Sequence, residues 1–357
     1  MVERLSPPST DYATDWGYAF GRPPASASLK TTPEEFVVEE LLGFSPSGEG
    51  EHLWLTLRKR GVNTHWLGQQ LQRFAGLRGV DVGYAGMKDR HGLTTQTFSL
   101  NFSGRSEPDW SQFRCEGVEL LDRVRHSRKL KRGQLLGNRF TITLTAIDGV
   151  QQALEMRLQQ IREQGVPNYF GEQRFGHHAA NIGRAEAMFS GKLRIRDRNQ
   201  RGIYLSAARS WLFNQLLSQR VIAGNWNRLL EGDLPLYDRC SRPLLPLQAG
   251  DERLQNPPPD LHPSGPLWGD GPTPAQGEPG AWEKGLQLQA PSLCRGLEAA
   301  RLEQERRALR LLLPSLQWEW LQMDRLRLCF ELPAGCYATT VLRELVVIHL
   351  LSSGRSE

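Results

Sequence analysis

Strict alternation of apolar and polar residues predicts a protein rich in β-strands. The clearest case is the run after residue 96, where Phe98, Leu100 and Phe102 share one face while Thr97 and Ser99 face the other way. The same period of two predicts further strands at residues 36–39, 52–60, 118–124, 137–144 and 325–332, with a short one near 80–82. Strands with one apolar face need a partner layer, so helices should cover the sheet.

Apolar residues spaced by three and four positions predict those helices. The best-defined one is capped by Asn63 or Thr64, carries Leu67 and Leu71 on one face, and ends at Gly76. The other predicted helices run from Asp148 to Gly165, over 206–222 and 292–313, and after Thr339 or Thr340 as a cap. Residues 250–290, rich in Pro and Gly, predict a coiled surface excursion within a second domain.

Length and composition are those of an ordinary globular protein. With 357 residues, 39% of them apolar, the chain is long enough for two domains. The five cysteines form no C-x-x-C pair, which predicts neither a zinc site nor a disulfide framework, and their odd number suits a reducing compartment. No signal-peptide pattern or membrane-spanning run is visible, so we expect a cytoplasmic protein with no membrane partner.

The net charge of +5 is mild, but the cations are clustered. Six lie within ten residues, Arg123, Arg125, Arg128, Lys129, Lys131 and Arg132, and a second stripe comprises Lys192, Arg194, Arg196, Arg198 and Arg201. Like charges in a cluster repel one another, so an anionic partner is favoured over a merely solvated loop. Phosphate groups of a nucleic acid are the natural candidates.

The loop between the strands near 80–82 and 97–102 contains the strongest candidate for chemistry. It runs from Gly86 to Gln96 and places Asp89 between Lys88 and Arg90, which favour the ionised carboxylate. Gly, Lys, Asp and Arg are also common in a solvated surface turn, so composition alone favours a turn over a catalytic loop.

The amino-acid sequences of this loop and of four later segments resemble those of the TruD family of tRNA pseudouridine synthases. The matching segments, in chain order, are Gly86–Gln96, Gly137-Asn138-Arg139-Phe140, Pro167–Gly176, Leu205–Asn214 and Leu332–Glu344. The likeness extends from about Lys30 to Leu345 and is weakest between 225 and 290. One departure is Tyr337, where the family usually has Phe.

The resemblance implies an α/β (α+β) fold in two domains. A discontinuous pseudouridine synthase domain, residues 1–163 and 311–357, would carry a mixed, largely antiparallel sheet. Residues 164–310 would form an inserted α/β TRUD domain that covers the RNA-binding cleft. The implied enzyme is an isomerase, an intramolecular transferase that acts on uridine 13 of tRNA without a cofactor or metal, and we expect a monomer.

The resemblance also implies the roles of particular residues. Asp89 would be the catalytic carboxylate, and Phe36, Asn138 and Tyr337 would line the pocket for a flipped-out uracil. Further candidates for substrate binding are Lys30, Lys88 and Phe140. The sequence does not choose between attack by Asp89 at C1′, its addition at C6 and its removal of the 2′-proton, nor does it identify the cation that pairs with Asp89.

Two other functions use some of the same features. A non-catalytic RNA-binding protein, such as a tRNA-folding factor, would need the basic stripes and aromatics but would have no reason to keep Asp89. A nucleoside hydrolase would show a cluster of carboxylates for a metal or for acid–base pairing, and none surrounds Asp89 in the sequence.

Overall fold

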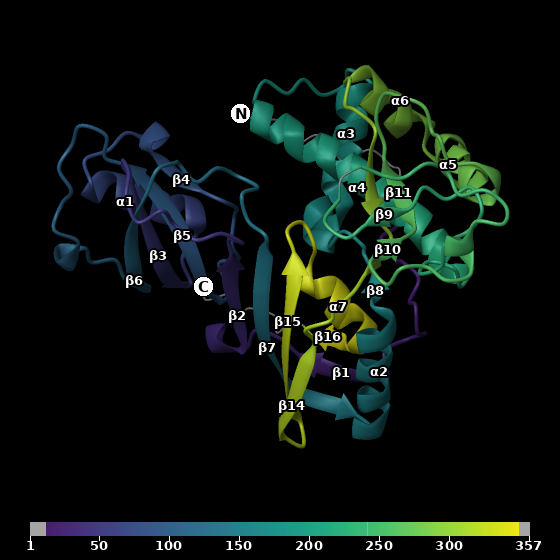
Figure 1. Cartoon of the computed structure of the whole chain (residues 1–357), viewed down its shortest axis with the longest axis horizontal. Helices are drawn as coiled ribbons and strands as arrows, with labels where there is room; N and C mark the ends of the chain where they lie inside the picture. Colours follow the sequence, from purple (N-terminus) through teal and green to yellow (C-terminus); the bar gives the residue numbers. More distant parts are fainter. Residues whose placement is uncertain (1–11, 241, 350–357) are drawn as a thin grey trace. The chain divides into compact units, whose positions relative to one another are not determined.

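The computed structural model describes residues 12–240 and 242–349, shown in Figure 1. Close packing divides them into two compact units. One unit comprises residues 24–155, 313–338 and 346–349, and the other comprises 12–23, 156–312 and 339–345. Within the described ranges, no helix combines the length and apolar character that crossing a bilayer requires.

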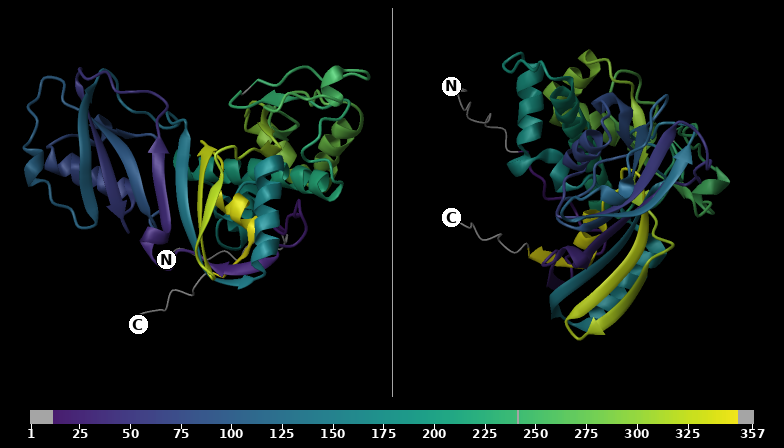
Figure 2. Two further views of the ribbon diagram at one scale, coloured as in Figure 1. Left: turned by 60° about the horizontal axis from the view of Figure 1, so that its bottom comes forward. Right: turned by 90° about the vertical axis from the view of Figure 1, so that its left-hand side faces the viewer.

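The first unit is built on a mixed, largely antiparallel sheet of ten strands (Figures 1 and 2). Seven of them lie side by side in the order β14 (Gln317–Gln322), β15 (Arg325–Pro333), β7 (Gly137–Gly149), β2 (Phe36–Leu41), β5 (Leu93–Asn101), β3 (His52–Arg60) and β6 (Val118–His126). β4 (Val82–Tyr84) pairs with β5, while β1 (Ala25–Ser28) pairs with β7 and with β16 (Val347–His349). The parallel pairs are β2 with β5 and β1 with β16. This arrangement confirms the expected fold class.

The strand register brings one row of side chains together on one face of this sheet. Val38 of β2 lies opposite Phe140 of β7, and Phe140 lies opposite Phe330 of β15. On the other side, Val38 pairs with Thr94 of β5 and Thr94 with Lys59 of β3. Because residues paired across strands share a face, all five side chains point to the same side. The row is apolar except where it ends in Thr94 and Lys59.

Helix α1 (Thr64–Phe74) packs its apolar side against strands β3 and β5. Leu67 and Leu71 are fully buried with Leu55 and Phe98 in one hydrophobic cluster. Asn63 is the N-cap, and its side-chain oxygen accepts hydrogen bonds from the backbone N–H groups of the first turn. The predicted helix and its cap are therefore confirmed.

The predicted strands are confirmed except near 80–82, where residues 79–81 form a 3-10 turn and the strand β4 begins only at Val82; β7 is longer than its alternating core. It continues to Gly149, so Asp148 belongs to the strand and helix α2 begins at Gln151 (Gln151–Gln164). The prediction that Asp148 opens this helix was wrong, because β1 pairs with that end of β7 and holds it extended. Gly165 does end α2, with a positive φ of 78°.

The second unit is helical with short two-stranded pairs. Its longest helix, α4 (Arg198–Ile222), begins eight residues earlier than predicted and has α3 (Ala180–Phe189) beside it. The strand pairs are β8 (Val166–Pro167) with β13 (Arg310–Leu311), β9 (Leu236–Tyr237) with β10 (Leu261–His262), and β11 (Ser264–Leu267) with β12 (Glu305–Ala308).

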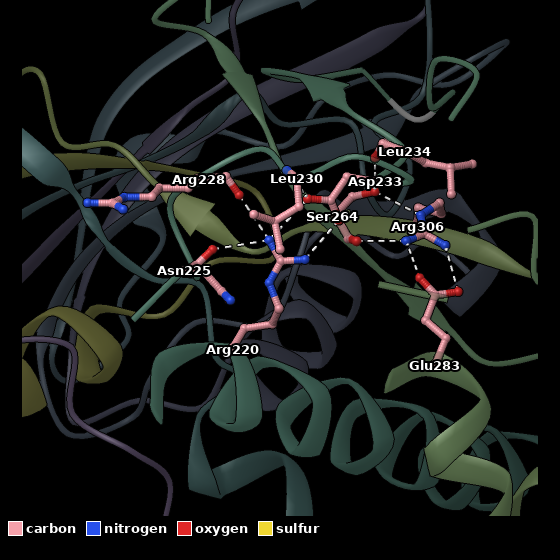
Figure 3. Close-up of polar contacts among 9 residues, drawn as sticks. All are labelled: Arg220, Asn225, Arg228, Leu230, Asp233, Leu234, Ser264, Glu283 and Arg306. Atoms are coloured by element: carbon pink, nitrogen blue, oxygen red, sulfur yellow. Dashed lines mark hydrogen bonds and ion pairs between the residues drawn. The ribbon is translucent and has the colours of Figure 1, made fainter. Parts of the chain in front are cut away.

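Buried ion pairs connect these elements (Figure 3). Arg220 on α4 binds Asp233 at 2.8 Å, and Arg306 on β12 binds Glu283 at 2.6 Å. Ser264 accepts a hydrogen bond from Arg306 and donates one to the carbonyl of Leu234, while the Nε of Arg220 is buried without a hydrogen-bond partner among the described residues. Pairs buried this completely depend on every partner, since removing one leaves an uncompensated charge.

Three sequence predictions for the C-terminal half were wrong in whole or in part. Residues 250–290 contain β10, β11 and helix α5 (Gly277–Gln289), so they are not merely coil. Residues 292–313 are helical only in α6 (Pro291–Ala299), after which the chain forms β12 and β13. Thr339 and Thr340 lie inside α7 (Ala338–Leu345) and do not cap it.

Candidate active site

The loop that contains Asp89 joins β4 to β5, and the side chains of two neutral residues form hydrogen bonds with its backbone. Thr64, the first residue of α1, accepts a hydrogen bond from the N–H of Lys88 at 3.0 Å and donates one to Gln96 at 3.0 Å. Gln96 in turn donates to the carbonyl of Gly86 at 2.6 Å. Both side chains are buried, so this chain of bonds fixes the first part of the loop, at Gly86 and Lys88, to α1 and β5.

At the far end of the loop the backbone passes very close to β2. A Cβ at Gly92 would lie 2.6 Å from the carbonyl oxygen of Phe36, a distance that only glycine avoids. The following residue, Leu93, begins the parallel pairing of β5 with Val37. Gly92 therefore allows the loop to enter the sheet directly beside Phe36.

Asp89 forms an ion pair with Lys30, a residue in a positive-φ conformation in the connection between β1 and β2. The other carboxylate oxygen accepts a hydrogen bond from the N–H of His91 at 3.0 Å. Partial burial tends to raise the pKa of Asp89, but the hydrogen bond and charge of Lys30, with the His91 N–H, hold the pKa below its usual value. Asp89 is therefore a charged carboxylate, and Lys30 is its partner.

A second lysine supports the same loop from the sheet. Lys59, at the end of β3, is 1% exposed, and its ammonium donates to the carbonyl of Asp89 at 2.9 Å and to that of Val62 at 2.8 Å. Burial lowers its pKa to about 8, while the charge of Asp89 opposes that shift. Lys59 thus fixes the backbone of the residue whose side chain Lys30 binds.

Lys88 extends its side chain toward residues of β2 and β7. Its ammonium lies 3.3 Å from Glu40 and donates a hydrogen bond to the side-chain oxygen of Asn138. Glu40 also accepts from the N–H of Thr97 at 3.0 Å. Burial lowers the pKa of Lys88 against the opposing charge of Glu40. Glu40 and Asn138 are paired across β2 and β7, so the register itself brings these two acceptors together.

Aromatic rings lie between these two polar groups. The ring of Phe36 packs edge-to-face on Phe140 at 6.1 Å, and Phe140 stacks on Phe330 at 5.6 Å. The ammonium of Lys30 lies 4.0 Å from the centre of the Phe36 ring, a cation–π distance. Lys30 therefore contacts both the Asp89 carboxylate and the ring of Phe36, and this ring is buried with Phe140 and Phe330.

The structure thus brings six of the seven residues predicted for the site into two contacting groups. Lys30, Asp89, Phe36 and Phe140 form one group, and Lys88 and Asn138 belong to the other. Tyr337 is half-buried and lies in the chain between β15 and α7. β15 pairs its Leu332 with Asn138, so Tyr337 follows the strand end that borders Asn138.

Sequence reasoning missed Lys59 and Glu40. The sequence contained a signal for both residues, because each one lies on the apolar face of its alternating strand. Lys59 continues the face of Leu55 and Leu57, and Glu40 continues that of Phe36 and Val38. A charge at an inward-facing position of a strand indicates a buried partner, since such groups are rarely buried unpaired.

The aromatic segment Pro167–Gly176 has a structural role within the second unit. Tyr169 is 1% exposed and its hydroxyl donates to the carbonyl of Gly17 at 3.1 Å. The rings of Trp16 and Tyr169 stack at 6.1 Å, and Phe170 packs edge-to-face on Phe213 at 5.6 Å. Tyr169 and Phe170 therefore pack among aromatic rings of this unit.

The two basic clusters remain largely unneutralised within the described chain. Of the first cluster, Arg125 pairs with Glu107, but no ion pair involves Arg128, Lys131 or Arg132 among the described residues. The second stripe is exposed, and none of its cations forms an ion pair with a carboxylate within residues 12–240 and 242–349. Among those same residues, no group of three or more His, Cys, Asp or Glu side chains is arranged to hold a metal ion.

The buried Glu40–Lys88 pair predicts a non-additive effect on stability. We expect Glu40→Gln to lower the free energy of unfolding by about 3 kcal/mol, because it leaves the Lys88 ammonium buried without its counter-charge. Adding Lys88→Met should recover part of that loss, since it removes the stranded charge. Urea unfolding of both single variants and the double variant measures the coupling, and strictly additive losses would contradict the pairing.

Lys59 predicts a specific pH dependence of stability. Its pKa of about 8 in the folded protein lies below the value of a free lysine, so between these two pH values the unfolded chain binds more protons. The contribution of Lys59 to the free energy of unfolding must therefore rise with pH over that interval. From pH 8 to pH 10 we expect the unfolding free energy of the wild type to gain about 2 kcal/mol relative to Lys59→Met. Urea titrations whose difference stays constant with pH would refute this assignment.

Comparison with known proteins connects this site to one family. A family model described as tRNA pseudouridine synthase D (TruD) matches residues 16–185 and 180–345. The tRNA pseudouridine synthase D of Nitrosococcus oceani is 50% identical over 331 residues, which cover 91% of this chain and 92% of that protein. The protein of the same name from Methylococcus capsulatus is 47% identical over 330 residues, covering 92% and 93%.

A solved structure has the same fold. The structure described as a putative tRNA pseudouridine synthase D from Methanosarcina mazei superposes with a TM-score of 0.70 over 92% of this chain and 95% of that one, at 22% identity. The family match and the identity to full-length relatives agree with the loop, strand and helix motifs on which the site is built. The chain therefore belongs to the tRNA pseudouridine synthase D (TruD) family.

Proposed function

We propose that this chain converts uridine 13 of tRNA to pseudouridine, with Asp89 as the catalytic carboxylate. Membership of the family establishes the reaction class, which is isomerisation of uridine to pseudouridine in RNA. The observation that carries the assignment of Asp89 is its ion pair with Lys30 beside the ring of Phe36. This arrangement places a charged carboxylate close to a largely buried aromatic ring.

The reaction needs little besides such a site. The N1–C1′ bond of the nucleoside breaks, the uracil turns, and C5 bonds to C1′; C5 loses a proton and N1 gains one, so atoms and electrons balance. The side chain of Asp89 is 29% exposed, so a ligand can reach its carboxylate. An ionised carboxylate there can act as nucleophile or base, and Lys30 maintains that ionised state.

The base itself requires a surface that binds it outside the RNA stack. A flipped base is held by aromatic stacking and by hydrogen bonds to its edges. We assign stacking to Phe36 and Tyr337, and hydrogen bonding to the amide of Asn138, whose oxygen Lys88 orients. Phe140 supports the ring of Phe36 from behind. Together these groups would keep the detached uracil in place while it turns.

The basic clusters supply the rest of the RNA-binding surface in this proposal. Cations without acidic partners attract phosphates and release counterions when they bind. We retain the division into a synthase domain of residues 1–163 and 311–357 and an inserted domain of 164–310. We also retain a monomeric, cytoplasmic enzyme as part of the proposal, since tRNA is its substrate.

The role of Asp89 is tested by removing only its charge. We expect Asp89→Asn to abolish turnover while leaving the fold and tRNA affinity nearly unchanged, because the amide keeps the shape but is a poor nucleophile and base. Release of tritium from 5-tritiated uridine in tRNA measures turnover, and Asp122→Asn, an exposed carboxylate on β6, is the matched control. Turnover of Asp89→Asn near the wild-type rate would exclude Asp89 as the catalytic group.

Tyr337 is tested by separating its ring from its hydroxyl. If the ring stacks on the uracil, Tyr337→Phe should retain single-turnover rates within about tenfold of the wild type, a difference near 1.4 kcal/mol. Tyr337→Ala should lose considerably more, because base stacking on an aromatic contributes about 1–3 kcal/mol. Equal damage by Phe and Ala would assign chemistry to the hydroxyl, and a harmless Ala would place Tyr337 outside the pocket.

Contact of the second basic stripe with phosphates predicts a change in salt dependence. Replacing Arg194 and Arg196 with Gln should reduce the slope of log K against log salt by roughly one unit per lost contact. The double variant of Arg58 and Arg327 to Gln is the control. It removes the same net charge from exposed positions that are paired with Glu119 and Glu319. Equal slopes for the wild type and the stripe variant would show that the stripe is merely solvated.

A further inference from the structure

A cavity of about 610 Å³ lies on the outer side of β4, apart from the contacts that hold Asp89. It lies between α1, β4 and the basic loop after β6. The side chains that define its chemistry are His65, Gln69, Tyr84, Lys129, Lys131 and Arg132. We call this the β4 cavity. None of the residues that line it is acidic.

The lining is suited to a nucleotide. Three cations without a carboxylate among the lining residues favour a phosphate group. The guanidinium of Arg132 lies 5.8 Å from the ring centre of Tyr84, so an aromatic face and a guanidinium plane are adjacent. Bases in single-stranded RNA stack on both kinds of surface. His65 and Gln69, whose side-chain nitrogens are 3.2 Å apart, are exposed and offer hydrogen bonds to a base edge.

The basic loop that forms one wall is held in place by its backbone. Leu130 donates its N–H to Ser99 at 2.9 Å, and Gly133 donates to the carbonyl of Ala85 at 2.8 Å. A Cβ at Gly83 would lie 2.3 Å from the carbonyl oxygen of Leu130, so a glycine in β4 lets the loop lie this close. The cations therefore extend from a fixed backbone, which reduces the entropy lost when a ligand binds.

The β4 cavity is also close to the candidate catalytic group along the chain. Tyr84 is the last residue of β4, and Asp89 follows five positions later. Five residues span at most about 18 Å even when fully extended. A ligand on Tyr84 is therefore within a few nucleotides of any uridine that reaches Asp89.

From these observations we propose that the β4 cavity binds a second nucleotide of the RNA substrate, close in sequence to the target uridine, with its base on Tyr84. This inference rests on the proposed function, because it assumes that RNA reaches Asp89. It makes the β4 cavity a determinant of which uridine is chosen, since a site that recognises a neighbouring base rejects RNAs that cannot place one there.

The experiment measures binding, so that it does not depend on turnover. Asp89→Asn protein is titrated with RNA oligonucleotides that carry the target uridine and a single abasic nucleotide at successive neighbouring positions. We expect one position at which loss of the base weakens binding about tenfold. The same abasic substitution should have little further effect in the Tyr84→Leu background, because the stacking partner is already gone.

Matched variants separate the base contact from packing and charge. Tyr84 packs on Phe98 at 5.7 Å, so Tyr84→Leu keeps an apolar group there, and Tyr84→Phe keeps the ring and should retain the full abasic effect. Lys131→Gln with Arg132→Gln should weaken every RNA alike. Circular dichroism checks that each variant is folded.

Three outcomes would overturn the inference. The first is the absence of any neighbouring position at which loss of the base weakens binding, which would reduce the β4 cavity to a phosphate-binding surface. The second is saturable binding of free uridine or adenosine monophosphate that Tyr84→Leu abolishes while RNA binding is unaffected, which would make it an effector site for free nucleotides. The third is retention of the full abasic effect in Tyr84→Leu.

Failure of this inference is distinguishable from failure of the proposed function. If wild-type protein forms pseudouridine but shows no coupling between Tyr84 and a neighbouring base, only the inference about the β4 cavity is lost. If no pseudouridine forms in any tRNA, the proposed function itself is wrong.

Discussion

The site depends on charged groups that the sheet removes from water and pairs with one another. The loop that carries Asp89 is attached to the sheet through Lys59, Lys88 and Lys30, and each of these ammonium groups has an oxygen partner. In a low-dielectric setting such pairs resist separation, because an unpaired buried charge is far more costly than a paired one. The same pairs that fix the loop therefore keep the Asp89 carboxylate ionised and oriented.

This constraint explains why a shared sheet face combines core packing with chemistry. Phe36, Phe140 and Phe330 form an aromatic row that would be ordinary core elsewhere. Here the row is flanked by Lys30 at one side and by the Glu40–Lys88 pair at the other. In the proposed reaction, these rings and the charged and amide groups beside them would hold the flipped base.

Sequence reasoning predicted the strands, the first helix with its cap, the fold class and the family, because alternation and motif wording are local signals. It failed where distant segments decide the outcome. β1 pairing extended β7 through Asp148, and the strands after Ala299 form because β11 and β8 are available as partners. Lys59 and Glu40 were not predicted, because the role of a charge at an inward-facing strand position depends on a partner that the local sequence does not show.

The central claim is that this chain forms pseudouridine in tRNA through Asp89, and mapping pseudouridine in cells tests it most directly. Cells that lack this protein should lose the modification at one tRNA uridine, position 13. The wild-type chain should restore it, whereas Asp89→Asn at equal abundance should not. An unchanged pseudouridine pattern in the deleted cells, or full restoration by the Asn variant, would contradict the account.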